Sequence, residues 1–198
     1  MESYFSIFLL ISVITISAIE DLRRQKIPNM VTFPTMVMAL GIHFIEAGPD
    51  GFLFGLGGLA LGMVIFLVPY TFGGMGAGDV KLMGAIGAIL GAKAIFITSI
   101  MVIIIGGVYG LILLAMSPRH MTSFVRRWWL TAKTFARTLR FIPIPPDKAE
   151  KQPVLKYAIP IALGTMGYMA MQYTGYDLFP ELLGIKFSLF SIAQGGTW

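Results

Sequence analysis

Two aspartates, Asp21 and Asp79, are the residues with the clearest capacity for chemistry in this chain. Each stands at the edge of a hydrophobic segment, where a carboxylate is costly and therefore indicates a functional site. Two carboxyl groups brought close together cannot both ionise cheaply, so the pair shares a proton. The ionised member can take a proton from water while the protonated member donates to a carbonyl oxygen or a leaving amine. Such a pair can hydrolyse a peptide bond without a covalent intermediate.

A glycine-rich run leads directly into the second aspartate, because residues 73–79 read GGMGAGD. Gly76 and Gly78 remove side chains beside Asp79, so another backbone can approach closely and the turn can adopt positive φ. A scissile peptide must come close to the acid, and we therefore predict a substrate-approach role for both glycines. The alternative is a turn that only starts a helix, with Asp79 as its N-cap residue.

Other catalytic chemistries find little support in the composition. The chain has no cysteine, which excludes thiol catalysis, disulfides and cysteine-based metal sites. Its two histidines, His43 and His120, are too few and too scattered to build a metal site, and the paired-histidine motif of metalloproteases is absent. No histidine lies near a serine in the motif regions. We therefore expect no cofactor and no metal, and two carboxylates with water remain.

The composition predicts an integral membrane protein. Hydrophobic residues make up 56% of the 198 residues, charged residues only 13%, and the mean hydropathy is +0.78, whereas a soluble domain averages about 25% charged residues. The first apolar stretch has no basic region before it and no small-residue cleavage site after it, so it is interpreted as a membrane anchor. The net charge of +5 is explained by membrane topology, and no nucleic-acid partner is expected.

The apolar pattern predicts an all-α membrane protein, with a bundle of six transmembrane helices in one domain over residues 1–198. About 20 residues are needed per span, and lipid-exposed backbone must be helical. Of the 15 Lys and Arg residues, all but Lys93 and Lys186 fall on one side, which predicts that both termini are outside and both aspartates cytoplasmic. The predicted helices cover residues 4–19, 30–45, 52–70, 80–90, 94–116 and 155–173.

Two further features concern the placement of these helices. The fourth segment is too short for a core of about 30 Å, so we expect Asp79 to lie below the cytoplasmic face in a water-filled notch. The alternative is a tilted or distorted helix with Asp79 at the surface. Residues 119–141 combine an aromatic apolar face with a basic one, which is typical of an interfacial helix in the cytoplasmic leaflet. Small residues four apart predict close helix packing; these pairs are Gly58 and Gly62, Gly87 and Gly91, and Gly106 and Gly110.

Two blocks of the chain resemble the type IV prepilin peptidases, membrane aspartic peptidases that carry a Gly-x-Gly-Asp motif. Residues 19–29 read IEDLRRQKIPN, and residues 76–84 read GAGDVKLMG. The apolar pattern extends the likeness over about residues 1–116. A weaker echo, YAIPIALG at residues 157–164, matches the last helix of the family.

The resemblance implies that Asp21 and Asp79 are the catalytic pair and that Lys81, a motif position, tunes the pKa of Asp79 or simply serves the positive-inside topology. It further implies that the substrates are prepilins or pilin-like secretion subunits, with a basic leader and a hydrophobic N-terminal helix, cut on the cytoplasmic side of the bacterial inner (plasma) membrane. Without the cysteine-bearing domain of many members, the chain is similar to the short form, and cleavage without methylation is expected.

Two other functions remain open at this point. One is a small proton- or cation-coupled transporter that uses Asp21 and Asp79 as ion ligands, although no inverted repeat is visible and both acids lie on one side. The other is a non-enzymatic membrane assembly subunit in which the two acids only cap helices. The sequence does not indicate an oligomeric state.

Overall fold

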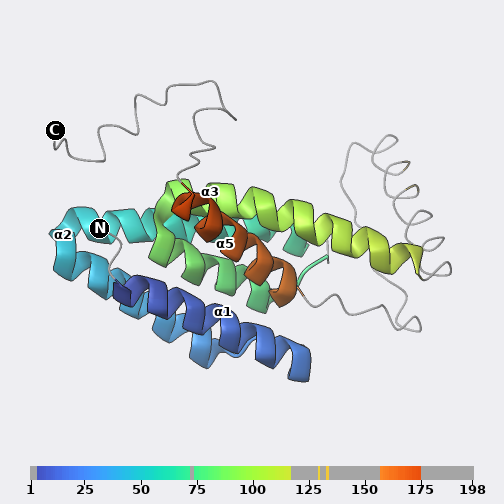
Figure 1. Ribbon diagram of the computed structural model, residues 1–198, viewed down its shortest axis with the longest axis horizontal. Helices are drawn as coiled ribbons and strands as arrows, with labels where there is room; N and C mark the ends of the chain where they lie inside the picture. Colours follow the sequence, from blue (N-terminus) through green and yellow to red (C-terminus); the bar gives the residue numbers. More distant parts are fainter. Residues whose placement is uncertain (1–3, 72–73, 117–128, 130–132, 134–156, 175–198) are drawn as a thin grey trace.

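The described part of the chain is entirely helical. The computed structural model describes residues 4–71, 74–116, 129, 133 and 157–174, and no strand occurs among them. Figure 1 shows the main elements, which are α1 (Tyr4–Arg24), α2 (Asn29–Thr71), α3 (Ala77–Ala115) and α5 (Ala158–Tyr173). Three of these helices, α1 to α3, are long and apolar enough to cross a membrane. The fold is therefore that of an all-α, multi-pass membrane protein.

Sharp bends divide α2 and α3. The first bend lies at Ala47 and Gly48, where Gly48 has φ 61° and Pro49 follows, and the second lies at Gly91 with φ 80°. Glycine adopts positive φ at little cost, so these positions can reverse the chain without strain. Both long helices fold back on themselves (Figure 1), and the resulting segments coincide with the predicted apolar stretches. That six segments cross the membrane, with both termini outside, stays a prediction.

Contacts between glycines hold the two bent helices together. A Cβ atom on Gly58 would collide with the carbonyl group of Gly87, and one on Gly87 would collide with that of Gly58. One turn further along α2, a Cβ atom on Gly62 would lie 3.0 Å from the carbonyl carbon of Met83. The prediction of close packing is thus confirmed for Gly58, Gly62 and Gly87, because no larger residue fits between the two backbones. At Gly106 a Cβ atom would meet only side chains at an ordinary 3.5 Å.

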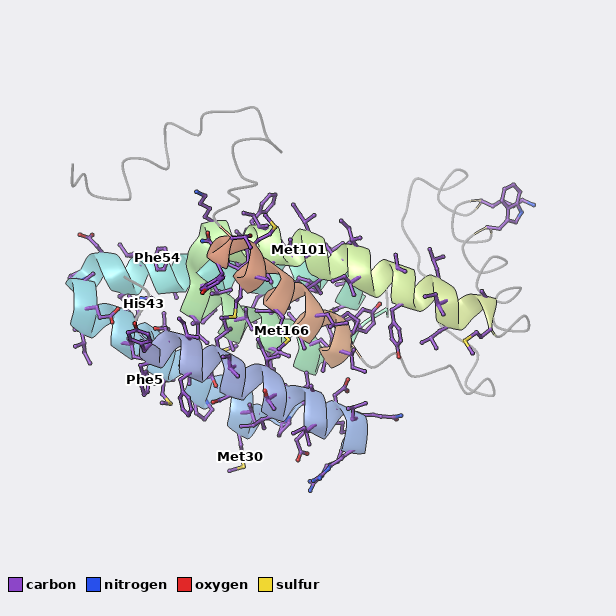
Figure 2. The ribbon with its side chains drawn as sticks, in the orientation of Figure 1. Phe5, Met30, His43, Phe54, Met101 and Met166 are labelled. Atoms are coloured by element: carbon purple, nitrogen blue, oxygen red, sulfur yellow. The ribbon has the colours of Figure 1, made fainter. Side chains whose placement is uncertain are left out.

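At the far end of the bundle, His43 links the two bends. Its Nε2 atom lies 3.1 Å from the carbonyl oxygen of Ile89, just before the bend of α3. The ring also meets Phe54 edge-to-face at 5.2 Å, and Figure 2 shows both side chains where α2 turns back. His43 therefore supplies a hydrogen bond to a carbonyl group next to the helix break.

The first helix is longer than predicted. The predicted helix ended at residue 19, which left Asp21 beyond it, but α1 continues to Arg24 and contains Asp21 in its last turns. An ion pair of 3.3 Å between Arg24 and Glu20 supports this extension, and basic residues favour the C-terminal end of a helix. Gln25, with φ 53°, ends the helix.

Large apolar side chains occupy both the core and the outer surface. The core contains Leu10 of α1, Phe66 of α2, Met83 and Ile86 of α3, and Ile161 of α5, all fully buried. Exposed apolar side chains cover the outer faces of the long helices, as expected for surfaces in contact with lipid; examples are Phe8, Val37, Ile45, Val64, Ile104 and Leu111.

The predicted interfacial helix at 119–141 lies outside the described residues, apart from Trp129 and Lys133, which have helical backbone and are exposed. The tail that follows residue 174 also lies outside them. The single domain over residues 1–198 stays a prediction.

Candidate active site

Asp21 is held by the start of another helix. Its side chain is only 6% exposed, and its Oδ2 atom accepts a hydrogen bond of 3.2 Å from the backbone N–H of Ala158, the first residue of α5. The N-cap residue of α5, Tyr157, provides no side-chain cap of its own. Since the first N–H groups of a helix lack partners within it and favour negative charge, Asp21 serves as the missing cap.

Asp79 lies in the first turn of α3 and is 8% exposed. Its Oδ2 atom accepts a hydrogen bond of 3.0 Å from the backbone N–H of Gly76, and its own N–H donates to the carbonyl oxygen of Gly76 at 3.1 Å. This reciprocal pair resembles a capping box, in which the third helical residue reaches back to the N-cap position. Asp79 is therefore not an N-cap residue, the role that the alternative interpretation gave it.

The two carboxyl groups come from separate helices, and both lie near the start of α5. They are close enough to interact electrostatically, and Asp79 interacts in the same way with the phenol of Tyr157. Figure 1 shows α5 packed beside α1 and α3, and all three helices contact one another. The structure thus brings together the two aspartates that the sequence singled out.

The two motif glycines act through their small size. A Cβ atom on Gly76 would lie 3.2 Å from Oδ2 of Asp79, and one on Gly78 would lie 3.1 Å from the Cβ atom of Ile27. Neither motif glycine uses its freedom to adopt positive φ, because among the described glycines only Gly48 and Gly91 do so. Gly78 lets the start of α3 pack against the loop after α1. A role of either glycine in substrate approach stays a prediction.

Lys81 connects α3 to the start of α2. Its Nζ atom donates a hydrogen bond of 2.9 Å to Oδ1 of Asn29 and lies 5.1 Å from the centre of the Phe33 ring, a distance at which a cation and an aromatic face attract. Lys81 therefore ties the helix that carries Asp79 to the chain that follows Asp21. Its predicted effect on Asp79 itself stays a prediction.

Sequence reasoning missed two of these partners. Asn29 belongs to the first motif block, which was the available signal, but nothing in the sequence paired it with Lys81. The backbone N–H group of Ala158 could not be recognised from the sequence, because every residue except proline carries a backbone N–H. Only the weak echo at 157–164 pointed to this segment.

Both aspartates are less than a tenth exposed. The water-filled notch expected from the short fourth segment stays a prediction. In the described part of the chain, no group of three or more His, Asp or Glu side chains could hold a metal ion.

Buried paired carboxyl groups at the ends of apolar helices define the class, a multi-pass membrane protein with a compact acidic site. A sequence model described as the type IV leader peptidase family matches residues 8–111, which include both aspartates. The chain therefore belongs to the type IV leader peptidase family, as the two motif blocks predicted.

The curated proteins include a relative in Bacillus subtilis (strain 168) named prepilin leader peptidase/N-methyltransferase. It is 32% identical to this chain over 108 residues, which is 54% of this chain and 43% of the relative. The chain thus spans less than half the length of that relative. No solved structure matches the chain.

Proposed function

We propose that this protein is an aspartic endopeptidase that removes the leader peptide from type IV prepilins and pilin-like secretion subunits at the cytoplasmic face of the membrane. The observation that carries the proposal is that Asp21 and Asp79, from separate helices, are both buried and lie near enough for their carboxyl groups to interact electrostatically. Both residues lie within the part of the chain that matches the leader peptidase family.

The proposed reaction needs one proton shared by the pair. Repulsion between two buried carboxylates favours the state in which one is protonated. The ionised member takes a proton from water as the water oxygen bonds to the scissile carbonyl carbon, and the protonated member donates to the carbonyl oxygen. The C–N bond then breaks as the carboxyl group that took the proton from water gives it to the leaving amine, and the other carboxylate takes a proton back from a hydroxyl group of the tetrahedral intermediate. This route uses only the two side chains, water and the substrate.

Main-chain hydrogen bonds orient both acids for this step. Asp21 and Asp79 each use Oδ2 to accept a backbone N–H, from Ala158 and Gly76 respectively. Hydrogen bonds from N–H groups to a carboxylate are stronger than those between neutral groups, so each side chain is held in one orientation. The carboxyl groups held in this way would exchange protons with water and substrate.

The substrate class follows from the family and from the position of the site. The aspartates lie at helix ends next to apolar spans, so a peptide bond just before a membrane-embedded helix would lie at their level. Prepilins with a basic leader before a hydrophobic helix meet this requirement. Cleavage without methylation by this chain, and an active site on the cytoplasmic side of the bacterial inner membrane, remain predictions.

The test is cleavage of a synthetic leader–pilin peptide by purified protein. We expect Asp21→Asn and Asp79→Asn each to reduce cleavage to background, because neither amide can exchange the proton that hydrolysis needs. Asp50→Asn is the matched control, since Asp50 is an exposed acid beside the bend of α2. Full cleavage by either site variant, with normal membrane insertion, would disprove the proposal. Family membership does not favour the transporter alternative, which would require ion flux without proteolysis.

A further inference from the structure

Ser17 of α1 has a buried hydroxyl group that the mechanism above does not use. The residue is 0% exposed, and its Oγ atom has no hydrogen-bond partner among the described residues. Buried polar groups are nearly always hydrogen-bonded, because an unpaired group loses its hydrogen bonds to water without gaining a protein partner, which costs free energy. An unpaired buried hydroxyl group therefore calls for a functional explanation.

Other hydroxyl groups in these helices satisfy themselves locally. Ser99 donates to the carbonyl oxygen of Ile95 at 2.6 Å, and Thr15, in the same helix as Ser17, donates to Ile11 at 2.7 Å. The same contact to the residue four positions earlier is made by Thr35, Thr98 and Thr165. Such bonds are the usual solution for Ser and Thr in apolar helices. Ser17 does not use this local solution.

Its place on the helix explains what the hydroxyl group can reach. Ser17 lies four residues before Asp21, and both are buried on the same face of α1. Side chains four apart on a helix have Cβ atoms about 5–6 Å apart, which a hydroxyl and a carboxyl group can span directly or through one water molecule. Val13 and Ile14, the buried neighbours one turn earlier, are apolar.

We propose that Ser17 is a positioning residue for Asp21: its hydroxyl group donates a hydrogen bond to the Asp21 carboxylate, directly or through one water molecule, when the substrate is bound. Together with the N–H of Ala158, this second donor fixes the carboxylate in the orientation for proton transfer. The inference rests on the proposed peptidase function, because it assigns Ser17 a role in the same reaction.

The test compares Ser17→Ala and Ser17→Cys with Ser99→Ala, which removes an equally buried hydroxyl group that is locally satisfied. We expect Ser17→Ala to lower kcat by about 10- to 100-fold, the range for a hydrogen bond to a charged group, with little change in KM. Ser17→Cys, a weaker donor, should have an intermediate kcat. Thermal stability should not fall in Ser17→Ala, since an unpaired hydroxyl group is removed.

The outcomes separate this inference from the proposed function. If Ser17→Ala keeps the wild-type kcat while Asp21→Asn is inactive, the inference fails and the peptidase function stands. Equal losses of kcat in Ser17→Ala and Ser99→Ala would also overturn it, because packing would then explain both. Cleavage by Asp21→Asn would overturn the peptidase function itself.

Discussion

At the scale of single residues, each of the two aspartates accepts a hydrogen bond from a main-chain N–H group. Asp21 is bound by the N–H of Ala158 and Asp79 by the N–H of Gly76, so no substitution at Ala158 or Gly76 other than proline deletes a donor. What a substitution can do is displace the carboxylate. Gly76 is the sensitive position, because a Cβ atom there would lie 3.2 Å from Oδ2 of Asp79.

We therefore predict that Gly76→Ala lowers the rate of peptide cleavage without abolishing it. The added methyl group must push the Asp79 carboxylate by a few tenths of an ångström, and small misplacements of a catalytic group reduce rates steeply. Gly74→Ala is the control in the same run, because its Cβ atom would meet only the Pro69 carbonyl oxygen at an ordinary 3.5 Å. Steady-state cleavage rates of the two variants compare the positions, and equal rates would refute the prediction.

A second residue-scale prediction concerns the link between Lys81 and Asn29. Removing the Asn29 amide in Asn29→Ala leaves the Lys81 ammonium group without its 2.9 Å acceptor, so the start of α2 loses a hydrogen bond to α3. We expect lower cleavage activity together with a lower temperature of unfolding. A drop in activity with unchanged unfolding would instead place Asn29 in contact with the substrate.

At the scale of elements, the contact between α2 and α3 depends on glycine. Gly58 faces Gly87 so closely that a Cβ atom would collide with the opposite carbonyl group, while the neighbouring Gly57 faces open space. Of these adjacent positions in one helix, Gly58 has no room for a side chain and Gly57 has room for one, so the two can be compared directly.

We predict that Gly58→Ala destabilises the fold by about 1–3 kcal/mol, the usual cost of forcing an extra group into a packed contact. Gly57→Ala should be neutral or slightly stabilising, because alanine favours the helix over glycine. Unfolding of both variants in detergent, followed by circular dichroism, measures the difference. Similar stabilities would show that the helices can move apart without cost.

The sequence allowed a good prediction of the elements and of the acidic pair, for physical reasons. A helix in the hydrocarbon core needs a long apolar run, so the helical segments could be recognised in the sequence. A carboxylate near hydrocarbon costs free energy, so the two aspartates could be recognised as candidate functional residues. The predicted end of α1 at residue 19 was wrong, because the charged residues after it are typical of a loop. An ion pair between Glu20 and Arg24, one helical turn apart, supports the helix there. The α5 contact with Asp21 could not be foreseen, since a backbone donor carries no residue signature.

At the scale of the whole molecule, the distribution of Lys and Arg predicts which side of the membrane each connection faces. The natural absence of cysteine makes this testable, because any introduced cysteine is the single thiol of the chain. Gln25, after α1, and Asp50, at the bend of α2, are both exposed in the structure, so both suit chemical labelling.

We predict that a membrane-impermeant thiol reagent labels Asp50→Cys in intact cells and labels Gln25→Cys only after the membrane is opened. The cysteine-free wild type is the control for background labelling. The reverse pattern would place both aspartates outside and would contradict the predicted orientation.

The bond between Asp21 and the first turn of α5 has a consequence for biogenesis. The ribosome completes α1, α2 and α3 long before it reaches Ala158, so a nascent chain carries both acids but lacks the donor that fixes one of them. On the proposed function, the site is therefore complete only when the last described helix docks, and the nascent chain lacks peptidase activity until then.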